Sequence, residues 1–471
     1  MLSQRAAGLS PSSTAALDAR VKKLIADGVD VINLTGGEVD FPTPQQACAG
    51  GRRAIDQGYT RYTPVAGIFP LRQAIADRLT RRCGCPYPAQ QVIVTNGAKQ
   101  ALANAFAVLL DPGDEVILQS PYWVSFPHMI TLVGGVPVTI RTSAETGFKL
   151  TPAALLESIT PRSKVLLINS PANPTGVVYD RHELNALAEV ALAHGLCIVS
   201  DEIYGDLVYP GTEFTSVASL GEDVRARTVT VGGFSKTFAM TGWRVGFAAG
   251  PQPVIAAMAA IQGHTTSAPS SISQLAALSV LADEPVAEFE RQRMELDHRR
   301  KVVTAGLAEL PGVRLAAEPN GAFYAFVDVT GTYGSSGTDA ATFAERLLLD
   351  AGVAVMPGAD FGAPDHVRLS YAVSTDDLHE ALQRMRHFFT HQHLQKEARM
   401  STVTYSVQGM TCGGCAKRVR AALETDVPGL QDIEIDPKAG WVRFSSEQPV
   451  ADTDVQAAVE RTGYKFAGLM T

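Results

Sequence analysis

The chain has 471 residues, a formal net charge of −8 at pH 7, 46% hydrophobic residues and 19% charged residues, as expected of a globular protein with a sizeable core. We see no basic stripe, so nucleic acid is not an expected partner. No apolar run approaches the roughly 20 residues that a membrane-spanning helix needs. The amino-terminal residues lack the apolar stretch of a signal peptide, which makes the cytoplasm the expected compartment.

The amino-terminal part predicts a helix and a short strand. Residues 11–30 place apolar side chains at helical spacing after a Ser/Thr-rich start. Residues 31–34 are typical of a strand, which runs into Gly36 and Gly37. Glycines at the end of a strand let backbone N–H groups approach a ligand closely, and a plain turn is the alternative.

From residue 91 onward, apolar runs alternate with helical patterns. Strands buried on both faces have such continuous runs, and the alternation predicts a doubly wound, mostly parallel sheet of seven strands. Ligands of such sheets bind beyond the carboxyl ends of the strands, so the residues that follow each strand are candidates for a site. The expected strands are residues 92–95, 115–119, 136–140, 164–169, 196–200, 228–232 and 244–249.

The first two of these strands lead into an anion-binding pattern and an aromatic residue. Gly97, Ala98 and Lys99 open the next helix, where free N–H groups and the helix dipole suit a phosphate. Trp123 follows the second strand, and such an aromatic is either a core residue or a platform for a flat ring.

The later strands end in polar residues of defined chemistry. Asn173 lies in a dense Asn/Pro/Gly turn that can hold its side chain rigidly. Asp201 and Tyr204 follow the fifth strand. A carboxylate buried there needs a partner, which a protonated pyridine nitrogen would supply, and the tyrosine could donate to a phenolic oxygen on the same ring.

The sixth strand leads to Lys236, with Arg244 eight residues further on. A desolvated lysine has a lowered pKa and becomes a nucleophile for an aldehyde, and the planar guanidinium suits a phosphate. The pair suggests pyridoxal phosphate (PLP). Taken alone, a surface lysine and an unrelated arginine are the alternative.

The region after the sheet predicts a second lobe. Residues 287–310 are typical of a long charged helix, and strands are expected near residues 319–324, 353–356 and 366–371. Arg368 lies in an apolar strand, where an unpaired guanidinium is costly. It therefore needs an anion, either a structural Asp or Glu or the carboxylate of a substrate.

These features resemble the class I aminotransferases of PLP fold type I, especially their bacterial aspartate/aromatic aminotransferase-like branch, over about residues 5–390. The strings that carry the resemblance are residues 37–41, 61–67, 120–125, 173–176, 200–204, 236 with 244, and 367–370. The resemblance implies a large domain with the seven-stranded sheet and a small α/β domain.

The resemblance also assigns roles at the ring of PLP. Lys236 would hold the cofactor covalently and then move the substrate proton. Asp201 would keep the ring nitrogen protonated, Asn173 and Tyr204 would bind the ring oxygen, and Trp123 would stack on the ring. Lys236, Asp201, Tyr204 and Asn173 are the expected catalytic residues.

Further roles concern the phosphate and the substrate. Backbone amides of the segment Gly97, Ala98 and Lys99 would hold the phosphate together with Arg244. Tyr62 would reach the phosphate of the other subunit, which implies a homodimer with shared active sites. The α-carboxylate of an amino acid or 2-oxo acid would be bound by Gly37, Asn173 and Arg368.

The identity of the substrate stays open at this point. Members of this branch that act on aspartate carry a second cation for the distal carboxylate, expected near Ala107, and no replacement is evident there. A neutral or aromatic amino acid is therefore an equal expectation.

Residues 401–471 form a separate pattern, strand–helix–strand–strand–helix–strand, as in a ferredoxin-like βαββαβ fold. Residues 409–415, Gly-Met-Thr-Cys-Gly-Gly-Cys, resemble the metal loop of heavy-metal-associated domains. Two thiolates, Cys412 and Cys415, at a helix N-terminus suit a soft ion such as Cu(I), and a redox pair is the alternative. A metal-transfer partner protein is a further expectation.

We therefore expect a PLP-dependent aminotransferase with a ping-pong cycle and an appended Cu(I)-binding domain. The alternatives are lyase or synthase chemistry on the same fold, or a metal-handling protein with a vestigial enzyme domain. The expected domains are an N-terminal arm with part of the small domain (1–45), the PLP-binding large domain (46–290), the small domain (291–390), a linker (391–400) and the heavy-metal-associated domain (401–471).

Overall fold

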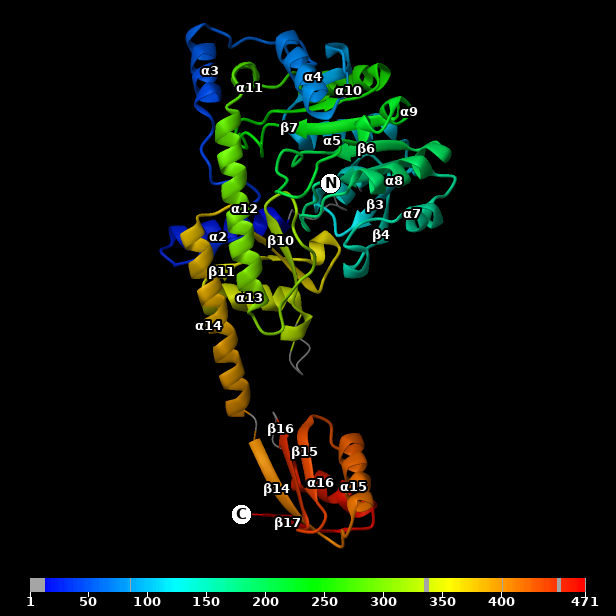
Figure 1. The fold of residues 1–471 in the computed structure, drawn as a ribbon, viewed down its shortest axis with the longest axis vertical. Coiled ribbons are helices and arrows are strands. Elements are labelled where there is room, and N and C mark those ends of the chain that lie inside the picture. Colours follow the sequence, from blue (N-terminus) through cyan, green and yellow to red (C-terminus); the bar gives the residue numbers. More distant parts are fainter. Residues whose placement is uncertain (1–12, 85, 334–338, 400, 447–449, 471) are drawn as a thin grey trace, which may run out of the picture. The chain divides into compact units, whose positions relative to one another are not determined.

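The computed structural model describes residues 13–84, 86–333, 339–399, 401–446 and 450–470. These residues divide into two compact units, the first reaching to Met385 and the second beginning at Arg386. Figure 1 colours the elements of both units along the sequence. None of the helices in the described residues combines the length and the apolarity that crossing a membrane requires.

The first unit is built on the expected seven-stranded sheet, whose order is β2-β8-β7-β6-β5-β3-β4. Strand β8 is antiparallel to both of its neighbours, whereas the other pairs are parallel. The segment between β7 and β8 contains no helix, so β8 returns beside β7 without a crossover. The strands are β2 (Val92–Thr95), β3 (Glu115–Ser120), β4 (Val136–Arg141), β5 (Ser163–Asn169), β6 (Cys197–Asp201), β7 (Thr228–Gly233) and β8 (Gly246–Ala249).

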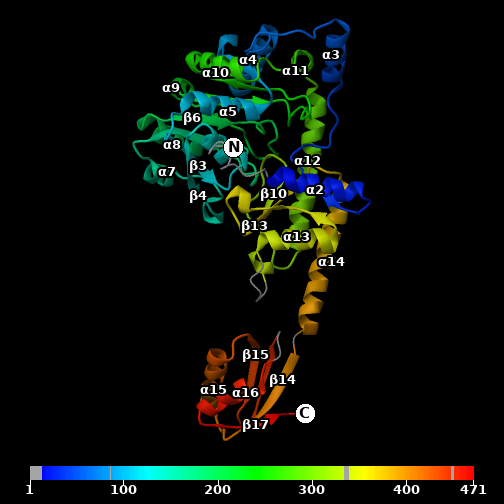
Figure 2. The ribbon, with the colours of Figure 1, turned by 180° about the vertical axis from the view of Figure 1, so that it is seen from behind.

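Helices cover both faces of this sheet (Figures 1 and 2). On one face, side chains such as Phe106 and Met258 pack on the strands, and on the other Leu155 and Leu187 do so. Strand β8 and the edge strand β2 are buried at every position and the strands between β8 and β4 at most positions, which is why these sequences are largely apolar, whereas the other edge strand, β4, is partly exposed. The helices of this part are α3 (Gln45–Asp56), α4 (Phe69–Cys83), α5 (Ala98–Leu109), α6 (Ser125–Leu132), α7 (Pro152–Ser158), α8 (Arg181–Ala193), α9 (Glu222–Arg225), α10 (Gln252–Thr265) and α11 (Ser271–Ala282).

The rest of the first unit contains a smaller sheet in the order β12-β13-β10-β9, namely Met356–Pro357, His366–Ser370, Tyr324–Asp328 and Arg314–Leu315. The single strand expected over residues 353–356 is wrong in detail. Strand β11 (Val353–Ala354) pairs with β1 (Ile32–Asn33), and β12 pairs instead with β13. Helices α2 (Ser13–Ala26), α12 (Val286–Ala308) and α13 (Ala340–Ala351) complete this part, and α14 (Thr375–Arg399) begins in the first unit and continues past its last residue, Met385. Short 3-10 helices lie at 89–91, 144–146, 217–219, 330–332 and 359–361.

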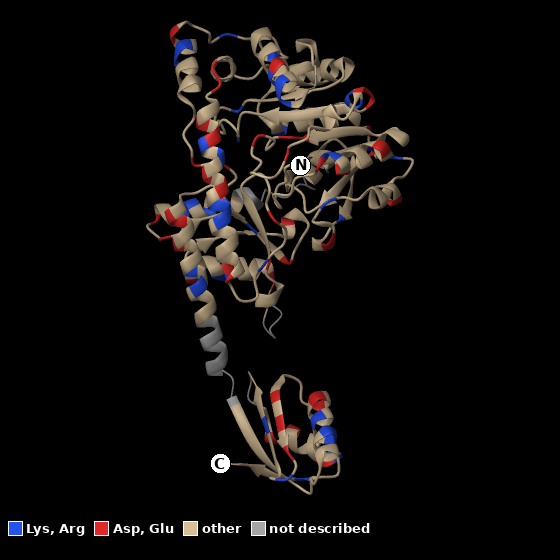
Figure 3. Cartoon of the chain, in the orientation of Figure 1, with Lys and Arg blue, Asp and Glu red and all other residues tan. Residues whose placement is uncertain are grey.

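The long helix α12 is charged, as expected from its sequence. Figure 3 shows acidic and basic residues interspersed along it. Several of them form ion pairs one turn apart, among them Arg293 with Glu290 and Lys301 with Asp297. Such pairs between side chains one turn apart stabilise the helix.

The second unit has the expected βαββαβ order and a four-stranded antiparallel sheet in the order β15-β16-β14-β17. Its core contains Tyr405, Val419, Leu423, Phe444 and Val459. The elements are β14 (Ser401–Gln408), α15 (Gly413–Asp426), β15 (Leu430–Asp436), β16 (Trp441–Ser446), α16 (Asp452–Arg461) and β17 (Lys465–Leu469).

Candidate active site and metal loop

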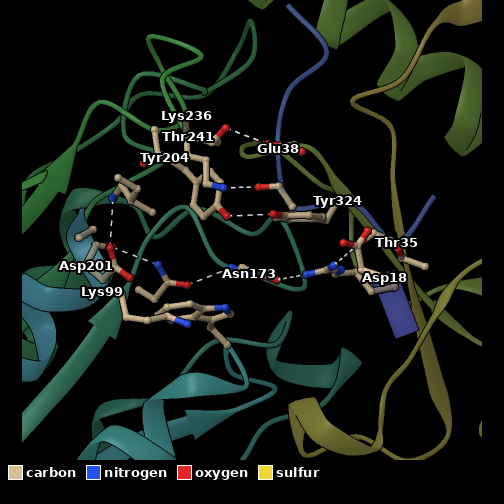
Figure 4. A pocket seen from close by; sticks show the side chains of 18 of the residues that line it. Asp18, Thr35, Glu38, Lys99, Asn173, Asp201, Tyr204, Lys236, Thr241 and Tyr324 are labelled. Carbon is tan, nitrogen blue, oxygen red and sulfur yellow. Dashed lines mark hydrogen bonds between the residues drawn. The ribbon is translucent and has the colours of Figure 1, made fainter. Parts of the chain in front are cut away.

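A cavity of about 430 Å³ lies beyond the carboxyl ends of the strands of the large sheet. Figure 4 shows Lys236, Tyr204, Tyr324 and Asn173 around the same space. Most of the predicted site residues line this cavity, both those expected at the strand ends of the large sheet and the two expected elsewhere, Gly37 and Arg368. The residues at the strand ends are Ala98, Lys99, Trp123, Asn173, Asp201, Tyr204, Lys236 and Arg244. Gly97 lies directly beside Arg244, as described below, whereas Tyr62 lies elsewhere and is 96% exposed.

Lys236 follows β7, and its amine donates a hydrogen bond to the carbonyl oxygen of Gly37. The amine also lies 5.9 Å and 5.8 Å from the ring centroids of Tyr204 and Phe323. Burial, assisted by the positive charge of Arg368, lowers the pKa of Lys236 to about 8. About a tenth of the amine is therefore neutral and nucleophilic at pH 7, far more than for an ordinary lysine.

Asp201 is the last residue of β6 and is only 4% exposed. Its Oδ1 accepts a hydrogen bond of 3.2 Å from the Ile203 N–H, and the side-chain amide of Asn169 donates to its backbone carbonyl at 3.1 Å. Burial raises the pKa of Asp201 to about 7, since this one N–H offsets only part of the desolvation. A cation placed against this carboxyl would favour its charged form.

Two tyrosines lie between Lys236 and Arg368. The hydroxyls of Tyr204 and Tyr324 are 2.9 Å apart, and burial raises the pKa of each, so that both remain donors at neutral pH. The guanidinium of Arg368 lies 4.4 Å from the centroid of the Tyr324 ring. The sequence placed Tyr324 only at the start of a strand. Nothing in the pattern showed that Tyr324, rather than its aromatic neighbour Phe323, would bring a hydroxyl into the site.

Arg368 lies in β13 opposite Phe326 of β10. Its Nη1 donates to Asn173 Oδ1 at 3.0 Å, and its Nη2 donates to the carbonyl oxygen of Thr35 at 2.7 Å. Its Nε is buried without a hydrogen-bond partner, and among the described residues no carboxylate pairs with the guanidinium. Burial lowers the pKa of Arg368, and a bound carboxylate would relieve both deficits.

The opposite wall of the cavity concentrates positive charge at the start of α5. A Cβ at Gly97, whose φ is +79°, would lie 2.5 Å from Arg244 Nη2, so only glycine lets the guanidinium reach this turn. The Lys99 amine lies 4.9 Å from the centroid of a Trp123 ring, and burial followed by repulsion from Arg244 lowers its pKa. These groups form an anion site at a helix N-terminus.

Several residues that line the cavity were not expected from the sequence. Asp18 and Lys22 come from α2 and pair with each other at 2.8 Å. Glu38 accepts a hydrogen bond of 2.8 Å from the Thr241 hydroxyl. Ser235, directly before Lys236, also lines the cavity. The side chain of Lys99 was missed as well, because only its backbone amide had been considered.

The metal loop of the second unit places Cys412 at the N-cap of α15 and Cys415 in its first turn, with their sulfur atoms 3.4 Å apart. Cys412 is exposed and Cys415 is buried. A hydrogen bond from the Tyr464 hydroxyl is the main cause that lowers the pKa of Cys415 to about 5, and the Thr411 and Cys412 N–H groups contribute further. Within the described residues, His, Cys, Asp and Glu form no group of three or more at which a metal could bind.

Comparison with known proteins agrees with this geometry. Residues 29–385 match the family described as aminotransferase class I and II, and residues 404–465 match the heavy-metal-associated domain. The chain therefore belongs to the class I and II aminotransferases and carries an appended heavy-metal-associated domain. It is an aminotransferase, and its family implies PLP as the cofactor, so the predictions of the enzyme class and of the fold are confirmed.

The most similar proteins found include the aspartate aminotransferase of Geobacillus stearothermophilus, 45% identical over 82% of this chain and 98% of that protein. The aspartate/prephenate aminotransferase of Thermus thermophilus is 46% identical over 81% of this chain and 97% of its own length. A solved structure of the Thermus thermophilus aspartate aminotransferase with maleate has a TM-score of 0.78 at 45% identity, covering 82% of this chain and 99% of that one.

The residues of the cavity fit PLP by their own chemistry. A nucleophilic lysine faces a cavity that also holds a buried, uncompensated carboxyl group and an anion site formed by a helix N-terminus and an arginine. An aldehyde, a basic ring nitrogen and a phosphate are the groups that these three features complement.

Proposed function

We propose that this aminotransferase acts on amino acids and 2-oxo acids that carry a second carboxylate, with L-aspartate as the expected donor. The observation that carries the proposal is the presence of two cations, Arg368 and Lys99, on the wall of one cavity. Arg368 lacks a partner for its buried Nε, and Lys99 is held over Trp123 with a lowered pKa. One carboxylate can bind at each, and the names of the relatives support this substrate class.

The same residues have distinct roles toward PLP. Lys236 would hold the cofactor covalently, Asp201 would face the ring nitrogen, Asn173 and Tyr204 would bind the ring oxygen, and Trp123 would lie against the ring. The N–H groups of Ala98 and Lys99 beside Gly97, together with Arg244, would hold the phosphate. Bound PLP supplies an electron-withdrawing ring that lets the Cα–H bond of an amino acid be broken.

The residues of the chain then orient the substrate and move its proton. Arg368, Asn173 and the Gly37 backbone fix the α-carboxylate, which sets the direction of the Cα–H bond. The amine of Lys236 takes the proton from Cα and returns it to the product, for which its pKa of about 8 is suitable near neutral pH. The buried tyrosine pair stays protonated and donates hydrogen bonds throughout.

Replacement of Lys99 by methionine is expected to change substrate preference. The variant keeps the length of the side chain and loses the charge that we assign to the distal carboxylate. The ratio of kcat/KM for L-aspartate to that for L-alanine should fall by at least about tenfold, because removing one partner of a partly buried charge pair weakens binding by at least that factor. Steady-state assays with both donors measure it.

Lys22→Met is the matched control, because Lys22 lines the same cavity but is mostly exposed and already paired with Asp18. Its ratio should stay within about twofold of the wild type. Equal losses of kcat/KM for both donors in Lys99→Met would contradict a role in specificity. They would indicate instead that the Lys99 side chain binds the phosphate.

We further propose that the enzyme is a homodimer in which Tyr62 binds the phosphate of the partner subunit. The support is that Tyr62 is 96% exposed, which is unusual for a tyrosine, and that Tyr59 and Phe69, on either side of it in the sequence, are also exposed, each at 54%. Tyr62→Phe should weaken PLP binding about tenfold while sedimentation still reports a dimer, since one hydrogen bond to a charged group is lost. A monomeric wild type would overturn the proposal.

For the second unit we propose Cu(I) bound by Cys412 and Cys415. The support is a pair of sulfur atoms 3.4 Å apart at a helix N-terminus, one of them with a pKa of about 5, because soft thiolates in low number suit Cu(I) better than Zn(II). A metal-transfer partner protein is part of this proposal.

Anaerobic titration of the full chain with Cu(I), against a competing chelator, should show one bound ion per chain. The Cys412→Ser, Cys415→Ser double variant should lose this binding by at least about a hundredfold, because the thiolates are the ligands. Cys197→Ser, in the sheet of the first unit, is the control and should bind as the wild type does. Preference for Zn(II) over Cu(I) would refute the assignment of the metal.

A further inference from the structure

The active-site lysine borders a second cavity. Besides the cavity described above, Lys236 lines a smaller one of about 190 Å³, whose wall also contains Thr237, Arg78 and Asp206. A group of charged and polar side chains therefore adjoins Lys236 that the chemistry proposed above does not use.

Asp206 is the centre of this group. Its Oδ2 accepts hydrogen bonds from the Thr237 hydroxyl at 2.9 Å and from Arg78 Nη2 at 3.2 Å, and its Oδ1 lies 3.0 Å from Arg82 Nε. Burial opposes the charged form, but Arg82 and Arg78 outweigh it and hold the pKa of Asp206 below its usual value. The carboxylate is thus a charged acceptor with each of its oxygens occupied.

These contacts join the two segments that carry the main functional side chains. Asp206 lies in the turn that follows Asp201, the last residue of β6, and that contains Tyr204, whose carbonyl accepts a hydrogen bond of 2.7 Å from the Leu207 N–H. Thr237 is the residue next to Lys236 and is only 6% exposed. The hydrogen bond from Thr237 to Asp206 therefore connects the segment that contains Lys236 to the segment that contains Asp201 and Tyr204.

The chain is shaped to admit the arginines that hold Asp206. Arg78 and Arg82 lie one turn apart on α4, and Arg78 also pairs with Glu284 at 2.9 Å. A Cβ at Gly205 would lie 2.0 Å from Arg82 Nη2, so a side chain at this position would displace the guanidinium. The absence of a side chain at Gly205 is what lets Arg82 reach the carboxylate of the next residue.

We propose that Asp206 is a positioning residue for Lys236. Through its hydrogen bond with the Thr237 hydroxyl, Asp206 fixes the position of Lys236 relative to Asp201 and Tyr204. The proposal rests on the role proposed above for Lys236. A lysine that both holds a cofactor and moves a proton must stay within a fraction of an ångström of its working position, and misplacement lowers the rate of proton transfer more than it lowers binding.

The test compares Thr237→Val, which removes the hydroxyl, with Thr237→Ser, which keeps it, in the PLP-loaded full chain. Three quantities are measured: the single-turnover rate with L-aspartate, the pH midpoint of the visible band of bound PLP, and the affinity for maleate as an unreactive dicarboxylate. For Thr237→Val we expect a rate about 10- to 100-fold lower, a shifted pH midpoint and maleate affinity within about twofold of the wild type.

Thr237→Ser should stay within about threefold of the wild-type rate, and Asp206→Asn should reproduce the effects of Thr237→Val. Glu284→Gln is the matched control, because it removes a partner of Arg78 without touching Asp206, and it should keep the wild-type rate and pH midpoint. If Thr237→Val fails to fold, comparing the rate and pH midpoint of Asp206→Asn with those of Glu284→Gln still tests whether Asp206 positions Lys236.

A wild-type rate and pH midpoint in Thr237→Val or in Asp206→Asn would overturn the proposal, and so would a serine variant as slow as the valine variant. Failure of the proposed function would look different. In that case the visible band of the wild-type protein itself would not respond to L-aspartate, before any variant is made.

Discussion

Replacement of Lys236 by alanine is expected to lower turnover by about 10⁴-fold, the upper range for loss of a positioned acid–base group, and to leave PLP bound only non-covalently. The physical reason is the environment of the amine. Its pKa of about 8 makes it both a nucleophile and a proton carrier near neutral pH. Two other lysines that line the cavity have different roles, since Lys22 pairs with Asp18 and we assign Lys99 to the distal carboxylate of the substrate. Borohydride reduction followed by mass spectrometry of the peptide that contains residue 236 measures the covalent bond, and single-turnover kinetics measure the loss of rate.

Two variants make this result specific to the amine. Lys236→Arg keeps the positive charge but should be nearly as slow as Lys236→Ala, because a guanidinium does not deprotonate in this pH range. Lys149→Ala removes a lysine that pairs with Glu183 outside the cavity, and it should keep wild-type turnover and covalent PLP. Reduction that labels a different lysine in the wild type would show that the site is wrongly assigned.

The sequence predicts the strands and their ends well for a physical reason. Parallel strands inside the sheet such as β6 and β7 are buried at nearly every position, so their residues are mostly apolar or small, and the functional polar residues come at or just after the carboxyl end, where ligands bind. Asp201 and Lys236 could be found in this way because the first ends its strand and the second follows its strand within a few residues. The edge strand β4 was found too, although it is partly exposed, since its run still alternates with helices.

What the sequence could not predict depends on contacts between distant segments. The Lys99 side chain was missed because a helix N-terminus in the sequence indicates only free amides, whereas the side chain lies over Trp123, which comes from the loop after β3. The hydrogen bonds of Arg368 to Asn173 and Thr35 join residues far apart in the chain, so the sequence could show only that the guanidinium needs partners. The sequence predicted strands where β1 and β11 lie, but it could not show that these two segments, far apart in the chain, pair with each other.

Replacement of Asp201 by asparagine is expected to have opposite effects on turnover and on the stability of the cofactor-free protein. Asparagine cannot supply the negative charge for a protonated ring nitrogen. We therefore expect kcat to fall by about 10²- to 10³-fold, the effect of removing one partner of a buried charge pair. Asp201→Glu keeps the charge on a longer side chain and should recover part of the rate. Steady-state kinetics of the PLP-loaded variants measure both.

The stability effect follows from the pKa of about 7, which lies above the value of an unfolded aspartate. Between roughly pH 4 and pH 7 the folded cofactor-free protein keeps a proton that the unfolded chain has lost, so its stability declines as pH rises through this window. Asparagine does not titrate, and cofactor-free Asp201→Asn should therefore gain stability relative to the wild type as pH rises from 5 to 8, by a few kcal/mol at most. Urea unfolding of both proteins at pH 5 and pH 8 measures this difference. If the variant instead loses stability relative to the wild type as pH rises, the carboxylate is already compensated within the protein, and its proposed role as the partner of a ring nitrogen loses its physical basis.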